Sequence, residues 1–226
     1  MIKLEAKKDK FMNIQDVPSP IDLRNPQDAL NWANEANDKR PWRYDFFDYY
    51  VSFIQELEQQ RDHIKNTLPI HVLEIGSGPG FLAKHLLSHC LNIHYSAVDF
   101  SQAMHELSKN KLLSGELERA SYVIADFKTS QWRDDLAHYD VVIIHQALHE
   151  LRHKHHATQF HIEVKSLLKP NASYLVCDHI FATDAMQNNE LYMSKYEHFQ
   201  RLKQASYQHV NLVKEHQGLC LFLTKI

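Results

Sequence analysis

Apolar residues fall into short runs that alternate with segments of helical periodicity from residue 70 to the C-terminus. The runs predict strands at 70–75, 93–98, 121–125, 139–144 and 174–177, and a closing hairpin formed by 210–213 and 219–223. The periodic segments predict helices at 81–87, 101–113, 154–168 and 194–205. Strands that alternate with helices predict an α/β fold with a mainly parallel sheet and helices on both faces.

Two segments are expected to organise the chain: an N-terminal arm with a helical lid over residues 1–65, and the α/β domain over residues 66–226. Residues 1–20 are charged and end in Pro-Ser-Pro, which is typical of a loose arm. A short helix is predicted over 26–37, and a helix rich in aromatic residues over 42–57. The aromatic helix either packs on the edge of the sheet or forms a lid over a ligand site.

A glycine-rich turn follows the first predicted strand in the sequence Glu-Ile-Gly-Ser-Gly-Pro-Gly, residues 74–80. Gly76, Gly78 and Gly80 are three of the five glycines in the whole chain, so the backbone here needs conformations that other residues avoid. The turn predicts a close approach to a ligand at the start of a helix. It is neither a dinucleotide fingerprint, because Phe81 stands three residues after Gly78, nor a Walker loop, because no Gly-Lys pair occurs.

Further polar residues follow the other strands of the series. Asp99 lies 19 residues beyond Gly80, the spacing at which nucleotide-binding folds place an acid on the ribose hydroxyls. Asp126 follows the third strand and His145 the fourth. Ligands of parallel sheets bind beyond the carboxyl ends of the strands, so these side chains and the glycine turn are expected to border one site.

Taken in order, these segments resemble the class I S-adenosylmethionine-dependent methyltransferases. The resemblance covers residues 70–226 and includes E-x-G-x-G-x-G at 74–80, Asp-Phe-Ser at 99–101, Asp-Phe at 126–127 and Leu-Leu-Lys-Pro at 167–170. Gln-Ala-Leu-His-Glu-Leu at 146–151 is similar to the branch that acts on small molecules. The resemblance implies a Rossmann-like seven-stranded sheet with a C-terminal antiparallel hairpin. It implies methyl transfer from S-adenosylmethionine, which becomes S-adenosylhomocysteine, to an oxygen, nitrogen or sulfur nucleophile.

The chain also departs from this family pattern. Asn171-Ala172 stands where the family usually has paired glycines, which affects a turn and not the cofactor site. The Asn/Asp-Pro-Pro-Tyr signature of amino-directed base methylation does not follow the fourth strand, and paired metal-binding carboxylates of the catechol type are not evident. The family pattern therefore does not identify the methyl acceptor.

The resemblance also implies roles for single residues. The glycines let the methionine portion approach the backbone, Glu74 steadies the turn or the amino group, Asp99 holds the ribose, and Asp126 with Phe127 meets the adenine. The complete set implied for cofactor binding is Glu74, Gly76, Ser77, Gly78, Gly80, Asp99, Phe100, Met104, Asp126, Phe127 and His145. The residues implied for acceptor binding are Trp42, Tyr44, His149 and Asp178.

His149 is the candidate general base, about one turn beyond the end of the fourth strand. A histidine can remove a proton near neutral pH because its unperturbed pKa is about 6.5. A packing or orienting role remains open, since a thiol or amine acceptor does not require a base. His179, which follows the fifth strand, competes for the same catalytic role.

Two other classes of protein stay open. His149-Glu150-Leu151-Arg152-His153 satisfies H-E-x-x-H, which on a helix supplies two zinc ligands and a general base. With 17 histidines in the chain, such a match arises readily by chance, and no metal is expected. The other class is a methyltransferase-like protein that binds the cofactor without transferring a methyl group.

Composition limits the partners. A net charge of −3 gives no basic surface for nucleic acid, and no apolar run approaches the length of a membrane span. The N-terminus lacks an apolar secretion signal, and the three cysteines are far apart in the sequence, as expected for a protein of the reducing cytoplasm. We therefore expect a cytoplasmic enzyme with a small-molecule acceptor, no nucleic-acid partner and no membrane partner. The oligomeric state is left open.

Overall fold

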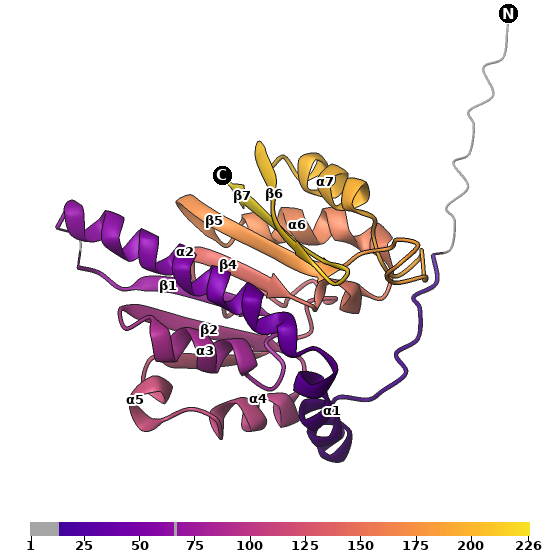
Figure 1. The fold of residues 1–226 in the computed structure, drawn as a ribbon, viewed down its shortest axis with the longest axis horizontal. Helices are drawn as coiled ribbons and strands as arrows, with labels where there is room; N and C mark the ends of the chain where they lie inside the picture. Colours follow the sequence, from indigo (N-terminus) through magenta and orange to yellow (C-terminus); the bar gives the residue numbers. More distant parts are fainter. Residues whose placement is uncertain (1–13, 66) are drawn as a thin grey trace, which may run out of the picture.

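A computed structural model describes residues 14–65 and 67–226 and contains a seven-stranded sheet in the order β3-β2-β1-β4-β5-β7-β6. The strands are β1 (Ile70–Ile75), β2 (Ile93–Asp99), β3 (Ala120–Ile124), β4 (Tyr139–His145), β5 (Leu168–His179), β6 (His209–His216) and β7 (Leu219–Lys225). Strands β1 to β5 run parallel, and β7 pairs antiparallel with both β5 and β6 (Figure 1). The predicted Rossmann-like sheet with its C-terminal hairpin is confirmed.

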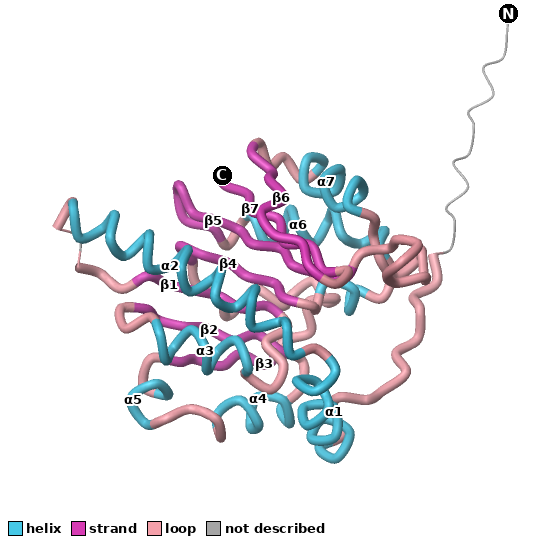
Figure 2. Tube along the Cα trace, viewed as in Figure 1, coloured by secondary structure: helices cyan, strands magenta, loops and turns pink. Residues whose placement is uncertain are grey.

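Helices cover both faces of this sheet (Figure 2). The α-helices are α1 (Pro26–Lys39), α2 (Tyr44–His63), α3 (Phe81–His89), α4 (Gln102–Lys109), α5 (Ser114–Leu117), α6 (Ala157–Lys165) and α7 (Lys195–Gln204). Three short 3₁₀ helices are η1 (Pro41–Arg43), η2 (Leu148–Leu151) and η3 (Lys154–His156). Helices α2 and α3 pack on one face of the sheet, and α6 and α7 pack on the other.

Alternating side chains of the central strands enter two separate cores. In β1, Ile70 and Val72 join the core beneath α2 and α3, whereas Leu73 and Ile75 join the core beneath α6 and α7. A strand buried on both faces is apolar along its whole length, which explains why these runs lack the alternation of a half-exposed strand. Both cores extend to the carboxyl ends of the strands, where the chain turns.

Strand β5 begins at Leu168, six residues before the predicted start at 174. Leu168 pairs with Tyr139, and the register then shifts before Ser173 pairs with Val141. Asn171 lies in this irregular stretch with a φ of 63°, a left-handed conformation that asparagine tolerates better than most residues. The Lys-Pro-Asn sequence therefore forms a bulged strand start, although its residues are typical of a turn.

Two predicted helices differ from the structure. The helix expected over 101–113 is shorter and ends as α4 at Lys109, while α5, at Ser114–Leu117, lies beyond the predicted range. The helix expected over 154–168 consists of η3 and the shorter α6. The remaining helices begin within two residues of their predicted starts. Asn25 and Ser194 cap two of these starts by accepting hydrogen bonds from backbone amides of the first turn.

Helix α2 contributes its aromatic side chains to the protein core. Phe46, Phe47 and Tyr50 are buried against β1, β4 and α3, so the helix packs on the face of the sheet over its central strands and not on the predicted edge. Residues 14–25 form neither helix nor strand and pass the carboxyl ends of the strands, where the Val17 amide donates to the carbonyl of Arg152 over 2.8 Å. Residues 1–13 of the predicted arm lie outside the described residues. None of the helices in the described residues combines the length and apolar character that a membrane crossing requires.

Four buried histidines predict loss of stability in acid. Burial lowers the pKa of His145 and of His161 to about 3, and the pKa of His105 and of His198 to about 4. The unfolded chain therefore takes up protons as the pH falls below about 6.5 while the folded chain does not, so the free energy of unfolding falls.

We expect His161→Gln to reduce this acid sensitivity, because glutamine does not ionise. Between pH 7 and pH 5 the free energy of unfolding should fall by roughly 2 kcal/mol less than in the unmodified protein, as measured by urea unfolding. His209→Gln, at an exposed position, serves as the matched control. An identical pH dependence in His161→Gln and in the unmodified protein would contradict the prediction.

Candidate functional site

A cavity of about 370 Å³ opens at the carboxyl edge of the parallel strands. Its walls come from the glycine turn after β1, the ends of β2 and β4, helix η2, and residues of α1 and η1. Residues 186, 191 and 192, from the connection between β5 and α7, and residues 19–21 and 23 of the N-terminal segment also line it. The cavity therefore lies where the sequence predicts a ligand site.

The glycine turn is shaped by contacts that leave no space for side chains at two of its three glycines. A Cβ at Gly76 would lie 2.4 Å from the Cβ of Ala147, and a Cβ at Gly80 would lie 2.0 Å from the Oγ of Ser108. All three glycines have positive φ, between 53° and 79°. Nothing lies within 4 Å of a Cβ built at Gly78, so this position faces open space that a ligand can fill.

Asp99 fixes the outer part of this turn. Its carboxylate accepts hydrogen bonds from the amides of Gly78, at 2.8 Å, and Ser101, at 2.9 Å. Burial raises the pKa of Asp99 to about 6, although these two hydrogen bonds oppose the shift. Ser101 in turn caps α4 by accepting from the amide of Met104. Asp99, the residue predicted to bind the ribose, thus also connects the turn to the following helix.

Glu74 lies fully buried beneath the turn and borders the cavity. It accepts a hydrogen bond from the hydroxyl of Tyr95. Burial raises the pKa of Glu74 to about 8 despite this bond, so its carboxyl group is mostly protonated at neutral pH. The side chain supports the turn as a neutral hydrogen-bonding group.

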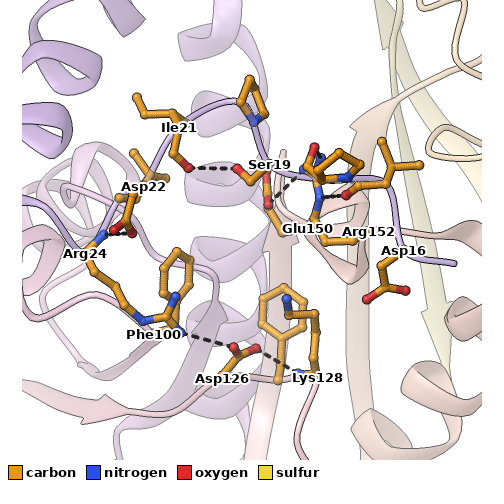
Figure 3. A pocket seen from close by; sticks show the side chains of 15 residues that line it. Asp16, Ser19, Ile21, Asp22, Arg24, Phe100, Asp126, Lys128, Glu150 and Arg152 are labelled. Carbon is orange, nitrogen blue, oxygen red and sulfur yellow. Dashed lines mark hydrogen bonds and ion pairs between the residues drawn. The ribbon is translucent and has the colours of Figure 1, made fainter.

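A second hollow of about 440 Å³ adjoins the first beneath residues 16–24 (Figure 3). The guanidinium of Arg24 lies 4.5 Å from the centre of the Phe100 ring and 3.3 Å from Oδ2 of Asp126. Arg152 holds the overlying segment by donating to the carbonyls of Val17, at 2.8 Å, and Pro18, at 2.7 Å. Arg24 thus lies between Asp126, a predicted adenine contact, and Phe100, another residue of the predicted cofactor site.

His149 and Asp178 form a hydrogen-bonded pair at the cavity. Nδ1 of His149 lies 2.7 Å from Oδ1 of Asp178, and the amide of His149 donates to Oδ2 of the same carboxylate over 2.7 Å. Burial alone would lower the pKa of His149. The charge and hydrogen bond of Asp178, together with the charge of Glu150, whose Oε1 lies 3.5 Å from Nε2 of His149, outweigh burial and raise it. Burial alone would raise the pKa of Asp178, and His149 lowers it to about 2. Because Nδ1–H donates to Asp178, Nε2 of neutral His149 keeps its lone pair.

Two further histidines at the cavity are held neutral. Burial lowers the pKa of His145 to about 3 and that of His179 to about 4. Nδ1 of His145 lies 3.0 Å from the hydroxyl of Tyr50, and the side-chain amide of Gln146 donates to Nε2 of His179 over 3.0 Å. At neutral pH neither histidine adds positive charge to the cavity.

The structure brings most of the predicted site residues together. Those that line the cavity are Glu74, Gly76, Ser77, Gly78, Asp99, Phe100, Met104, Phe127, His145, His149 and His179. Asp126 borders the second hollow, Gly80 packs against Ser108, and Asp178 lies behind His149.

Trp42 and Tyr44, predicted as acceptor contacts, do not line the cavity. The Trp42 ring lies 5.7 Å from the ring of His216, and Tyr44 packs on Phe47 and His85. Residue pattern alone could not show which members of the aromatic segment face the sheet. The cavity is also bordered by three arginines that were not predicted as site residues: Arg40, Arg43 and Arg152. The only sequence signal that could have indicated them is the basic run that ends α1.

The H-E-x-x-H sequence does not form the helix that its zinc-binding form requires. His149 lies in η2, Arg152 adopts a left-handed conformation with a φ of 64°, and His153 follows in extended conformation. Nδ1 of His149 is hydrogen-bonded to Asp178, and His149 and His153 do not lie on one face of a helix as two zinc ligands would. In the residues that the structure describes, no three His, Cys, Asp or Glu side chains are arranged to hold a metal ion.

Comparison with known proteins gives a consistent picture. The sequence of residues 72–171 matches the family described as a methyltransferase domain. PigF, solved with S-adenosylhomocysteine, has a TM-score of 0.68 at 17% identity, over 89% of this chain and 60% of PigF. The DhpI complex with S-adenosylhomocysteine has a TM-score of 0.62 at 18% identity, over 88% of this chain and 93% of DhpI.

A third similar structure is an O-methyltransferase family 2 protein from Planctomyces limnophilus in complex with apigenin. Its TM-score is 0.58 at 14% identity, over 70% of this chain and 51% of that protein. The chain spans 51% to 63% of the length of the first three structures matched. Among curated proteins, none matches the sequence. At these identities the structural likeness establishes the fold.

Proposed function

We propose that this class I S-adenosylmethionine-dependent methyltransferase methylates a small molecule at a hydroxyl oxygen. Its family follows from the methyltransferase domain over residues 72–171 together with the seven-stranded fold. The observation that carries the proposal is the His149–Asp178 pair, which borders the same cavity as the glycine turn. A nitrogen or sulfur nucleophile that must also lose a proton would use the same pair.

The residues of the cavity fit S-adenosylmethionine, the cofactor of this family. The space over Gly78 accepts a ligand that any side chain there would displace. The turn at Gly76 and Gly78 is suited to the methionine portion, Asp99 to the ribose, and Phe100 with Asp126 to the adenine. When bound, the cofactor supplies an activated methyl group on its sulfonium, so the protein must align the acceptor and exclude water.

The remaining lining of the cavity suits a small and partly apolar acceptor. Apolar surface in the same cavity as His149 comes from Phe47, Met186, Leu191 and Tyr192. The Tyr192 ring centre lies 5.3 Å from that of His149. The similar protein solved with apigenin, which carries hydroxyl groups on aromatic rings, is consistent with an acceptor of this class.

Nε2 of His149 takes the proton from the acceptor hydroxyl. Asp178 holds the ring in the required tautomer and orientation through Nδ1, and it stabilises the imidazolium formed when Nε2 takes the proton. His179 is less suited to this step because its pKa is lowered to about 4 and its Nε2 already accepts from Gln146. We assign His179 to the wall of the acceptor site.

The predicted lid is assigned mainly to residues 16–24 and not to the aromatic helix. This segment covers the second hollow and is held by Arg152, whereas the aromatic side chains of α2 lie in the core. Adenine can reach both Phe100 and Asp126 only when Arg24 moves from its place between them. The segment therefore has to adjust when the cofactor binds.

Gly78→Val tests the cofactor site. The protein should fold at some cost from the positive φ, but calorimetry should show S-adenosylhomocysteine binding weakened at least about 100-fold, because the side chain fills the ligand's space. Gly76→Val is the matched comparison and should be far less stable, since its Cβ would meet Ala147. Unchanged affinity in folded Gly78→Val would rule out this cofactor position.

His149→Gln tests the general base, with release of S-adenosylhomocysteine as the assay over a panel of small phenols, alcohols, amines and thiols. Turnover of the best acceptor should fall about 10²- to 10⁴-fold while cofactor affinity stays unchanged. Because only neutral His149 accepts a proton and its pKa is raised, kcat/KM should increase with pH and level off above a pKa higher than 6.5. Asp178→Asn should move this rise of kcat/KM to lower pH and lower the value at which kcat/KM levels off.

Full activity in His149→Gln would remove His149 from the mechanism. Binding of the cofactor without turnover of any acceptor in the panel would instead favour a non-catalytic cofactor-binding protein.

Arg152→Met tests the lid. Loss of the bonds to Val17 and Pro18 should release residues 16–24, so trypsin should cut after Arg24 faster than in the unmodified protein. S-adenosylhomocysteine should slow this cleavage in the unmodified protein and protect the variant less. Arg133→Met, at a residue outside both hollows, is the control. Equal cleavage with and without ligand would count against a lid at this segment.

A further inference from the structure

Arg43 is a buried cation that the described part of the protein leaves unpaired. Its side chain belongs to η1 and the residue is only 4% exposed. It donates one hydrogen bond to the carbonyl of Ala36, at 2.8 Å, and its Nε is buried without a partner. No carboxylate within residues 14–65 and 67–226 forms an ion pair with it.

Such an arrangement is unfavourable unless a ligand completes it. A charged group removed from water needs an opposite charge and full hydrogen bonding to offset the loss of hydration. Burial, followed by the charge of Arg40, lowers the pKa of Arg43 to about 10, so the guanidinium remains charged at neutral pH. Arg43 therefore offers a positively charged hydrogen-bond donor to the cavity that it borders.

The position of Arg43 relates it to the glycine turn. Its guanidinium carbon lies 5.6 Å from the centre of the Phe81 ring. Phe81 is the first residue of α3 and directly follows Gly80. The cation thus lies beside the first residue of α3 and lines the same cavity as the turn that is suited to the methionine portion of the cofactor.

Side chains around the cavity do not supply the missing anion. Glu74 is mostly protonated at neutral pH because its pKa is about 8. Asp99 accepts from two backbone amides, and Glu150 pairs with Arg152 at 3.2 Å. His145 and His179 are neutral, and Arg40 adds a second cation. The anion has to come from the ligand.

We propose that Arg43 binds the α-carboxylate of the methionine portion of the cofactor. This inference rests on the proposed function. S-adenosylmethionine carries two positive charges, the sulfonium and the ammonium, and a single negative charge. A buried arginine in its cavity is favourable only where it faces that carboxylate, and its planar fork of donors matches a carboxylate in geometry.

The test compares two ligands by calorimetry: S-adenosylhomocysteine, and 5′-methylthioadenosine, which lacks the amino acid portion. Arg43→Met should weaken binding of S-adenosylhomocysteine about 10- to 100-fold and leave binding of 5′-methylthioadenosine within about 2-fold. Arg43→Lys keeps the charge but not the planar pair of donors, so it should weaken binding of S-adenosylhomocysteine less than Arg43→Met does. Arg40→Met, at a half-buried neighbour that borders the same cavity, should change neither affinity by more than about 3-fold.

Three results would overturn the assignment. Equal weakening of both ligands in Arg43→Met would show that Arg43 only supports the packing of the site. Equal loss in Arg40→Met would assign the effect to the general positive charge of the cavity. Unchanged S-adenosylhomocysteine affinity with a raised KM for the acceptor would place the anion on the acceptor.

Failure of the proposed cofactor site would look different, because the unmodified protein would then bind neither ligand. Failure of the proposed methyl transfer alone would leave these affinities intact and would show only as absent turnover of every acceptor. Thermal unfolding confirms that each variant is folded before its affinities are compared. If Arg43→Met does not fold, Arg43→Lys carries the comparison, with a loss confined to S-adenosylhomocysteine as the expected result. An equal loss for both ligands in Arg43→Lys would again overturn the assignment.

Discussion

The close approach of the glycine turn to its neighbours is the constraint on which the site depends. Gly76 stands so near Ala147 that a Cβ there would lie 2.4 Å from the Cβ of Ala147. Ala147 directly precedes η2, the short helix that carries His149. The same contact that shapes the ligand-binding turn therefore sets how close the proposed base lies to it. The ligand-binding turn follows β1 and the proposed base follows β4, and both positions depend on this one contact.

Strand register then brings the base to its partner. His145 at the end of β4 pairs with Cys177 of β5, and the amide of Gln146 donates to the carbonyl of Cys177 over 2.8 Å. Asp178 is the next residue of β5, so its side chain points to the opposite face from that of Cys177, toward the turn that begins η2. A register shift of one residue would exchange these faces and separate Asp178 from His149.

Most of the fold could be predicted because its signals are local. Buried runs define the strands, and the glycines and strand-end acids define the edge at which the cavity opens. What could not be predicted depends on contacts between distant segments. Asp178 has the sequence context of an acceptor contact, yet its oxygens are bonded to His149 and to the amide of His179. Arg43 belongs to no motif, and only the packing of η1 against α1 and α2 brings it to the cavity.

The contrast between His149 and His179 shows why the role of a histidine is decided by the tertiary structure. Their ring centres lie 5.9 Å apart, and both residues hydrogen-bond to the carboxylate of Asp178. Asp178 accepts from the ring nitrogen of His149 but from the backbone amide of His179. The negative charge therefore stabilises the protonated ring of His149 and raises its pKa, whereas burial prevails at His179 and lowers its pKa to about 4. Of the two rings, only that of His149 is stabilised in the imidazolium form that a general base must adopt.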